Sequence, residues 1–97
     1  MATGQRLTLV VLVEVPADGV RALQEYEALV LPLLAAHDGR LERRLRDGTG
    51  QVEVHVLSFG SREAYAAYLA DEQRREHRPL LHGVDVQQRV LEVHEVQ

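Results

Sequence analysis

The chain has 97 residues, of which 45% are hydrophobic and 27% charged, a globular composition that excludes a disordered protein. Its net charge of −4 gives no electrostatic attraction to nucleic acid or to an anionic membrane surface, so neither is an expected partner. There is no cysteine, which excludes disulfides and thiolate chemistry. We expect residues 1–97 to form a single domain.

Residues 7–15 are the most apolar stretch of the chain. Both alternating faces are apolar until Glu14, and β-branched residues are frequent. Such a run predicts a central strand that is covered on both sides. The run is too short to cross a bilayer and is broken by Glu14 and Pro16, and it lacks the cleavage site of a signal peptide. We therefore expect a cytoplasmic protein, and the arginine-rich composition favours a bacterial one.

A helix is predicted from Val20, because apolar residues recur at helical spacing as far as Leu34. Pro32 removes one backbone hydrogen bond, so we expect a break near residues 30–31. Gly39 is expected in the left-handed position that ends the helix. Either Tyr26 or Glu27 can take the third position of the buried stripe, and much of the solvent-facing side is predicted to consist of Arg21, Gln24, Glu25 and Glu27.

Two strands joined by a tight turn are predicted next. Residues 40–46 alternate in a way that is typical of an edge strand, with Leu41, Arg43 and Leu45 sharing one face. Residues 47–50 have the Asp-Gly-Thr-Gly composition of a hairpin turn. In the strand at 51–59 one predicted face carries Val52, Val54, Val56 and Ser58, and the other carries Glu53, His55, Leu57 and Phe59.

A second helix is predicted to begin after Ser61, whose hydroxyl can cap its first turn. Its buried stripe would consist of Ala64, Tyr65, Tyr68 and Leu69. Residues 71–78 are almost wholly charged and are predicted to form a solvated helical end that Pro79 stops. A last strand is expected over residues 86–96.

The predicted order βαββαβ is that of a ferredoxin-like α+β fold. In this fold strands one and three lie in the middle of a four-stranded antiparallel sheet, and both helices cover one face. The opposite face would be apolar and bare, which predicts a homodimer that stacks sheet on sheet into a dimeric α/β barrel.

Several short segments carry a resemblance to a known family: Tyr26-Glu27, Pro32, Gly39-Arg40-Leu41, residues 54–59 and Ser61-x-Glu63-Ala64. With them the chain resembles the dimeric α/β-barrel superfamily, in an uncharacterised branch near the antibiotic-biosynthesis-monooxygenase-like proteins. The resemblance implies a pocket between sheet and helices. By this resemblance, haem-degrading and related cofactor-free members would rely on an Asn, a Trp and a His. This chain has neither Asn nor Trp, so that mechanism cannot be carried over to it residue by residue.

His55 is the strongest candidate for proton transfer, because histidine gains and loses a proton near neutral pH. Glu53 lies two residues away on the same face, and Arg43 or Arg44 could approach from the paired strand. The alternative is a hydrogen-bonded or ionic pair inside the dimer interface. An opening of His55 to a cavity lined by tyrosines favours an enzyme, whereas burial against a second subunit and pairing with Glu53 disfavours one.

Tyr26, Tyr65 and Tyr68 are predicted to form the wall of a pocket for an oxygenated ring or an acid. The alternative is a core role, with only the hydroxyl groups at the rim. Of the five histidines, no pair has metal-binding spacing, since Pro79 lies between His77 and His82. We therefore expect no metal and no cofactor.

Two functional hypotheses follow from the sequence. The first is a homodimeric barrel that binds a small organic ligand between sheet and helices. The second is a cofactor-independent isomerase, cyclase or monooxygenase-like enzyme. In that enzyme His55 would be the acid or base, and Arg44 or Tyr26 would position an oxyanion.

Overall fold

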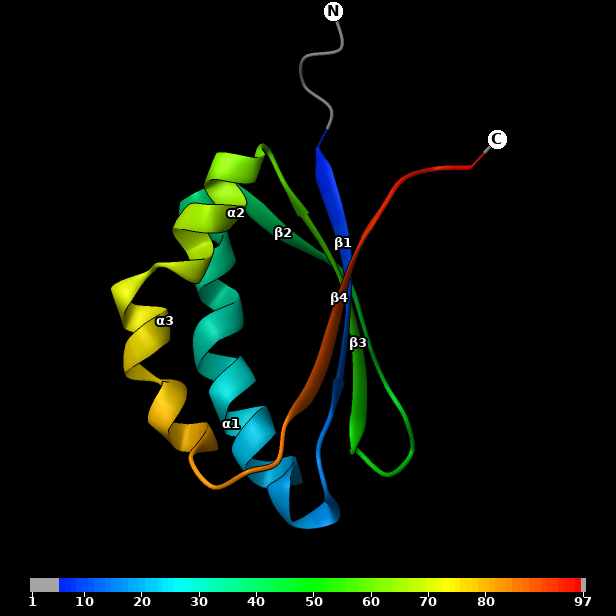
Figure 1. Ribbon diagram of the computed structural model, residues 1–97, viewed down its shortest axis with the longest axis vertical. Helices are drawn as coiled ribbons and strands as arrows, with labels where there is room; N and C mark the ends of the chain where they lie inside the picture. Colours follow the sequence, from blue (N-terminus) through cyan, green and yellow to red (C-terminus); the bar gives the residue numbers. More distant parts are fainter. Residues whose placement is uncertain (1–5, 97) are drawn as a thin grey trace, which may run out of the picture.

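A computed structural model describes residues 6–96 (Figure 1). The strands are β1 (Leu7–Glu14), β2 (Gly39–Arg46), β3 (Val52–Phe59) and β4 (Gln87–Val93). The α-helices are α1 (Val20–Val30), α2 (Arg62–Leu69) and α3 (Glu72–Glu76), and short 3-10 helices cover Ala17–Gly19, Leu31–His37 and Arg78–Leu81. The predicted βαββαβ order is confirmed, with α3 added to the second helical segment. Within these residues no helix is both long and apolar enough to cross a bilayer.

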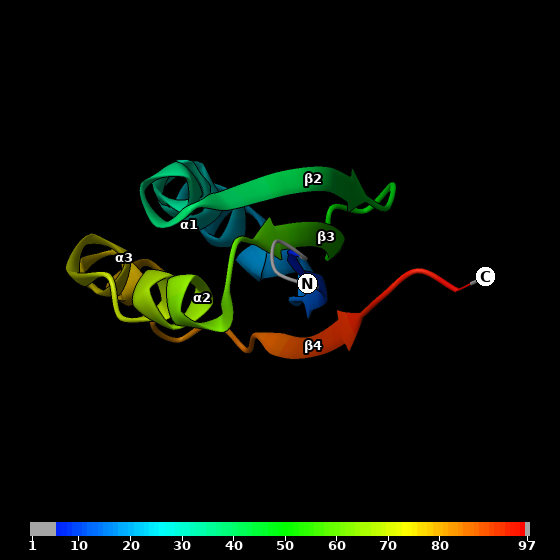
Figure 2. The ribbon, with the colours of Figure 1, turned by 90° about the horizontal axis from the view of Figure 1, so that it is seen from above.

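The four strands form one antiparallel sheet in the order β2-β3-β1-β4. The first and third strands are central, as the ferredoxin-like prediction requires. Figure 2 shows the three α-helices together on one face of this sheet, with no element of the described chain on the other. The sheet therefore has an inner face, which meets the helices, and an outer face, which does not.

The core lies between the inner face and the helices. Leu9, Val11 and Val13 of β1 are buried there, and they pack with Leu23 of α1 and Phe59 of β3. The alternate residues of β1, Thr8, Val10 and Leu12, lie on the outer face and are partly exposed. The alternation predicted for residues 51–59 is confirmed, since Glu53, His55, Leu57 and Phe59 are all buried.

The end of the first helical segment differs from the prediction in one respect. The break is where Pro32 placed it, because α1 ends at Val30 and a 3-10 helix follows. However, Asp38 and not Gly39 takes the left-handed conformation, with φ of 53°. Gly39 begins β2, where a Cβ atom would lie 2.7 Å from Cε1 of Phe59. The glycine is needed for this close approach and not for its freedom at positive φ.

The faces predicted for the second strand were wrong because β2 contains a register shift between Leu41 and Arg43. Leu41 pairs with Leu57, but Arg44 pairs with His55. Because a bulge changes which side chains share a face, Arg44 and Arg46 join Leu41 on the inner side. Strict alternation would have placed Leu41 with Arg43 instead.

The second helical segment also differs from the prediction. Ser61 caps α2 as expected, accepting a hydrogen bond from the backbone N–H of Ala64 at 3.0 Å. The chain then leaves the helix at Ala70, and Asp71 caps a separate helix, α3, by accepting from the N–H groups of Gln73 and Arg74. Residues 71–78 are thus not a continuation of α2. The break lets α3 fold back toward α1 (Figure 1).

Candidate functional site

Two adjoining hollows lie on the helical side of the sheet. The inner one has a volume of about 70 Å³ and is enclosed between the inner face and helices α1 and α2. The outer one is an open groove of about 1010 Å³ along α3, the 3-10 helix at 78–81 and the start of β4. Both are lined by Tyr26, Leu69, Arg74 and Gln88. These four shared residues mark the junction between the hollows.

The structure brings four of the five predicted site residues to the inner hollow. Tyr26, His55, Tyr65 and Tyr68 line it, and Tyr26 also lines the outer groove. The buried Tyr68 hydroxyl donates a hydrogen bond to the backbone carbonyl of Val30 at 3.4 Å. Burial raises the pKa of Tyr68, so this hydroxyl keeps its proton at neutral pH. Arg44, the fifth residue, lines neither hollow.

His55 lies in the middle of β3 on the inner face and is only 4% exposed. Its Nε2 atom lies 2.8 Å from Oε1 of Glu53 and 3.4 Å from Oε2 of Glu27. The side chain is therefore inside one copy of the chain, on the side of the sheet away from the bare outer face. It both borders the hollow and pairs with Glu53.

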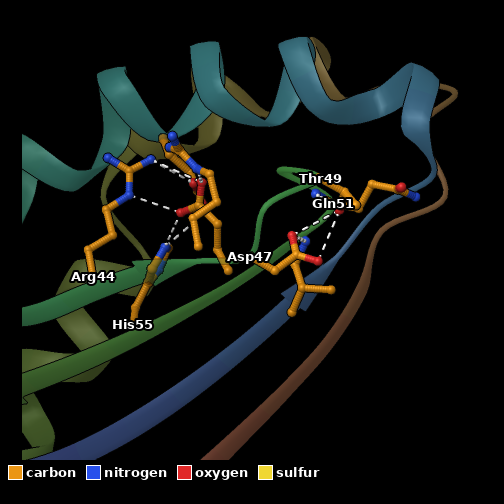
Figure 3. A network of polar contacts seen from close by, with 9 residues as sticks. Arg44, Asp47, Thr49, Gln51 and His55 are labelled. Atoms are coloured by element: carbon orange, nitrogen blue, oxygen red, sulfur yellow. Dashed lines mark hydrogen bonds and ion pairs between the residues drawn. The ribbon is translucent and has the colours of Figure 1, made fainter.

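Glu53 is fully buried and is held by two arginines of β2. Nε of Arg44 donates to Oε1 at 2.9 Å, and Nε of Arg46 donates to Oε2 at 2.8 Å. Burial by itself would raise the pKa of Glu53, but the hydrogen bonds, that from Arg44 foremost, bring it well below its usual range. Glu53 is thus the ionised member of the cluster. Figure 3 shows the side chains of Arg44 and His55 extending from neighbouring strands toward the same carboxylate oxygen, beneath the first helix.

Glu27 approaches the same cluster from α1 and is 4% exposed. Burial raises the pKa of Glu27 to about 8, together with the hydrogen bond that protonated Glu27 donates to Glu53 and the charge repulsion from Glu53. Nη2 of Arg44, which donates to Oε1 of Glu27 at 3.0 Å, works in the opposite direction. Glu27 is therefore mostly protonated and neutral at pH 7, and it lies beside Glu53, which is ionised.

Glu27 is buried and does not lie on the solvent-facing side of α1, where it was one of the predicted residues. Helical spacing allows either Tyr26 or Glu27 on the buried stripe, and the structure buries both. A glutamate is normally assigned to solvent, because burying its charge is costly without partners. The partners come from β2 and β3, which local periodicity does not reveal.

The ligand atoms of Glu27, Glu53 and His55 all lie within 4.8 Å of one another, which is close enough to hold a metal ion. The surrounding charges argue against that use. Arg44 and Arg46 already occupy both oxygens of Glu53, and Glu27 is largely neutral at pH 7. A divalent cation would have to displace two guanidinium groups, so the arrangement is better suited to sharing protons.

Arg74 of α3 is a further lining residue, and the sequence analysis had assigned it to solvent. Its guanidinium carbon lies 5.0 Å from the centre of the Tyr68 ring, which is a cation–π distance. Its Nε atom is buried and makes no hydrogen bond within residues 6–96, although the guanidinium lies near enough to the Tyr68 hydroxyl to oppose the rise that burial causes in the pKa of Tyr68. The helix break at Ala70 turns this arginine inward, and the charge pattern of residues 71–78 gives no sign of it.

No known protein-family signature matches the chain, and no curated protein does. Solved structures match it over nearly its whole length. A Bacteroides thetaiotaomicron protein, provisionally named an antibiotic biosynthesis monooxygenase, has a TM-score of 0.80 at 6% identity, covering 99% of this chain and 94% of that one. A Nitrosomonas europaea protein with the same provisional name has a TM-score of 0.76 at 12% identity, covering 94% and 99%. SnoaB, a cofactor-independent oxygenase from Streptomyces nogalater, has a TM-score of 0.70 at 15% identity, covering 94% and 95%.

The chain has the fold of these proteins. The likeness to antibiotic-biosynthesis-monooxygenase-like structures, expected from the sequence, is thereby confirmed for the fold. At such low identities a shared fold does not establish a shared reaction or a shared substrate. The function must be argued from the two hollows and from the cluster at their wall.

Proposed function

We propose that the protein binds a small organic molecule in the inner hollow, with the outer groove as its entrance. The observation that carries this proposal is the junction of the two hollows at Tyr26 and Arg74. Apolar and tyrosine walls with a few charged groups are typical of small-molecule sites, which usually enclose about 300–1,000 Å³. The inner hollow has only about 70 Å³, so the ligand would extend through the junction into the outer groove. The tyrosines supply ring faces for the body of the ligand.

Nuclear magnetic resonance screening of the 15N-labelled protein with a fragment library tests this proposal. We expect the amide shifts caused by bound fragments to gather on α1, α2 and the middle of β3. Leu69→Trp should abolish them, because Leu69 lines both hollows and the larger ring would fill their junction. Ala66→Trp is the matched control, since Ala66 is an exposed residue of the same helix. Fragment binding that survives Leu69→Trp would overturn the proposal.

The cluster at the cavity wall supports a second proposal, a cofactor-independent enzyme that moves protons. His55 borders the hollow and would exchange a proton with the ligand. Glu27, with its pKa raised to about 8, would exchange that proton with His55 in turn. A proton taken from one carbon of the ligand and returned to another gives an isomerisation, which needs no further reactant. A monooxygenase-like reaction would in addition consume oxygen.

The other two predicted catalytic residues have distinct places in this proposal. Tyr26 lines both hollows, so it is the proposed donor to an oxygen of the ligand. Arg44 would act as a positioning residue, because its guanidinium contacts the carboxylates of Glu27 and Glu53 and lines neither hollow. Its contribution would be to keep Glu53 ionised, so that the carboxylate can orient the His55 ring.

Hydrogen–deuterium exchange into a bound ligand tests the enzymatic proposal. In D2O, the C–H signals of a ligand found by the screen should disappear when the protein is present. His55→Gln should stop this exchange while leaving the affinity for the ligand within a few fold. Exchange that continues in His55→Gln would exclude His55 as the proton carrier. A ligand that binds without any exchange would leave the protein a binding module.

We further propose that the protein is a homodimer through the outer face of the sheet. Val10, Leu12, Val54, Val56 and Leu91 lie on this face and are only partly buried within one copy of the chain. A contiguous apolar surface of this kind is seldom left open to water. A second copy related by a two-fold axis would cover it with an identical surface.

A further inference from the structure

We propose that the ligand of the cavity is an organic monocarboxylate, and that the guanidinium of Arg74 binds its carboxylate at the junction of the two hollows. This inference rests on the proposed small-molecule function and names the chemical class of the ligand. The body of the ligand would occupy the inner hollow, and its acidic group would face the outer groove.

Arg74 has a hydrogen-bond donor that is not satisfied inside the protein. An arginine stays charged at all ordinary pH values, so its donors need acceptors wherever water is excluded. Nε of Arg74 is buried and has none within the described part of the chain. A carboxylate is the acceptor that best matches this group, because it can take two parallel hydrogen bonds from one guanidinium.

Arg74 is held in place before any ligand arrives. Its guanidinium lies over the ring of the buried Tyr68. Its helix is fixed at the N-terminus by Asp71, whose Oδ1 accepts from the N–H of Arg74 at 3.2 Å. The other oxygen of Asp71 lies 2.7 Å from Nε2 of His37, which ties the start of α3 to the segment that follows α1. An arginine fixed in this way loses little conformational freedom on binding.

The charge of the outer groove beside Arg74 also favours an acidic ligand. Among the described residues, the outer groove is lined by Arg74, Arg75 and Arg78 against one carboxylate, that of Asp85. It is therefore positive, although the chain as a whole carries −4. Glu27, the acidic group of the inner hollow, is mostly neutral at pH 7 and does not cancel this charge. The groove would thus attract an anion.

The walls of the inner hollow restrict the chemical character of the rest of the ligand. Its walls include Val11, Leu57 and Tyr65, which favour an apolar or aromatic body. Arg75 and Arg78 line only the outer groove, so among residues 6–96 Arg74 is the one arginine at the entrance to the inner hollow. One carboxylate on a small apolar body is the chemistry that fits both features.

Calorimetry with pairs of compounds tests this inference. Benzoate, phenylacetate and hexanoate would each be compared with the corresponding amide, which has the same shape and no charge. We expect each acid to bind about tenfold or more tightly than its amide, since hydrogen bonds between charged groups are roughly twice as strong as neutral ones. In Arg74→Gln this preference should disappear. Arg21→Gln, which removes an exposed arginine of α1, should keep it.

The outcomes separate this inference from the function on which it rests. Equal binding of acids and amides in the cavity would overturn the carboxylate assignment and leave the binding function intact. Binding of neither class at millimolar concentration would overturn both. The comparison of acid with amide in the unaltered protein needs no variant, so a failure of Arg74→Gln to fold does not remove the test. A preference that persists in Arg74→Gln would exclude Arg74 as the anchor.

Discussion

Arg44 lies directly opposite His55 across the β2–β3 pairing, one position further along the chain than a regular ladder would place it. The register shift between Leu41 and Arg43 causes this displacement. In an unshifted ladder Arg43 would occupy the place opposite His55, and Arg44 would face the other side of the sheet. The shift therefore supplies the guanidinium that two buried carboxylates require.

The first prediction concerns the energetic weight of this contact. Arg44→Gln should lower the free energy of unfolding by about 2–4 kcal/mol, because it leaves Glu27 and Glu53 with one guanidinium fewer in a buried site. Arg21→Gln is the control, since Arg21 is an exposed residue of α1 away from both the cluster and the outer face of the sheet, and it should change stability by no more than about 0.5 kcal/mol. Urea denaturation of both variants measures the difference. Equal stabilities would show that Arg44 does not neutralise the cluster.

The second prediction concerns pH. Glu27 has an ordinary pKa of 4.5 in the unfolded chain and one of about 8 in the folded protein. Between these values the folded state binds more protons than the unfolded state, so stability must fall as the pH rises from about 5 to about 8. Glu53 has a lowered pKa, so its stabilising contribution is lost below pH 4.5 and lies outside this window. Glu27→Gln has no proton to lose and should remove the Glu27 part of the decline.

The measurement is the free energy of unfolding of wild type and Glu27→Gln at several pH values between 5 and 8.5. We expect the difference between the two proteins to change by about 1–3 kcal/mol over this range in favour of the variant. Glu25→Gln is the control, because Glu25 is an exposed residue of the same helix and should leave the slope unchanged. Parallel curves for wild type and Glu27→Gln would contradict the raised pKa.

Much of the fold could be predicted from sequence because its signals are local. The apolar run at 7–15, the break at Pro32 and the cap at Ser61 each depend on neighbouring residues, and the structure agrees with them. The placement of the strands in the sheet followed from the same patterns, since the two most apolar strands must be central.

The parts that could not be predicted depend on contacts between distant segments. The register shift in β2 has no marker such as a glycine, and it alone decides that Arg44 and Arg46 face inward. Glu27 could be buried only because those arginines arrive from another element. Arg74 turns inward through the break after α2, where Asp71 starts a new helix instead of continuing the old one. Glu27 and Arg74 were read as solvent-facing because no partner is visible in the sequence, whereas Arg44 was already a candidate for the site and only the register shift that turns it inward was missed.

The third prediction concerns the glycine that begins β2. Gly39→Ala should destabilise the protein by about 1–3 kcal/mol, because the added methyl group has no room in the packed core. A Cβ atom there would lie 2.7 Å from Cε1 of Phe59 and 3.0 Å from the carbonyl oxygen of Leu34. Gly48→Ala, in the open hairpin turn where no atom lies within 4 Å, should change little. The midpoint of thermal unfolding is measured for both variants. A loss of stability in Gly39→Ala alone indicates a steric clash, whereas an equal loss in both indicates a general effect of replacing glycine.

The last prediction concerns the outer face of the sheet. We expect the wild-type protein to sediment as a dimer at micromolar concentration and Val56→Arg to sediment as a monomer. Val56 is a partly exposed residue of β3 on this face, paired with Val10 of the central strand. An arginine at the middle of a sheet-on-sheet contact would be buried without a partner. Burying an unpaired charge costs on the order of several kcal/mol, so the dimer should dissociate.

Ala67→Arg is the control, because Ala67 is exposed on α2, on the opposite side of the molecule from the outer face (Figure 2). It adds the same charge and should remain dimeric. A circular dichroism spectrum of each variant establishes that the fold is kept, since Val56→Arg places its charge on the side of the sheet away from the core. A wild-type protein that is monomeric at every concentration measured would show that the outer face of the sheet is open to water.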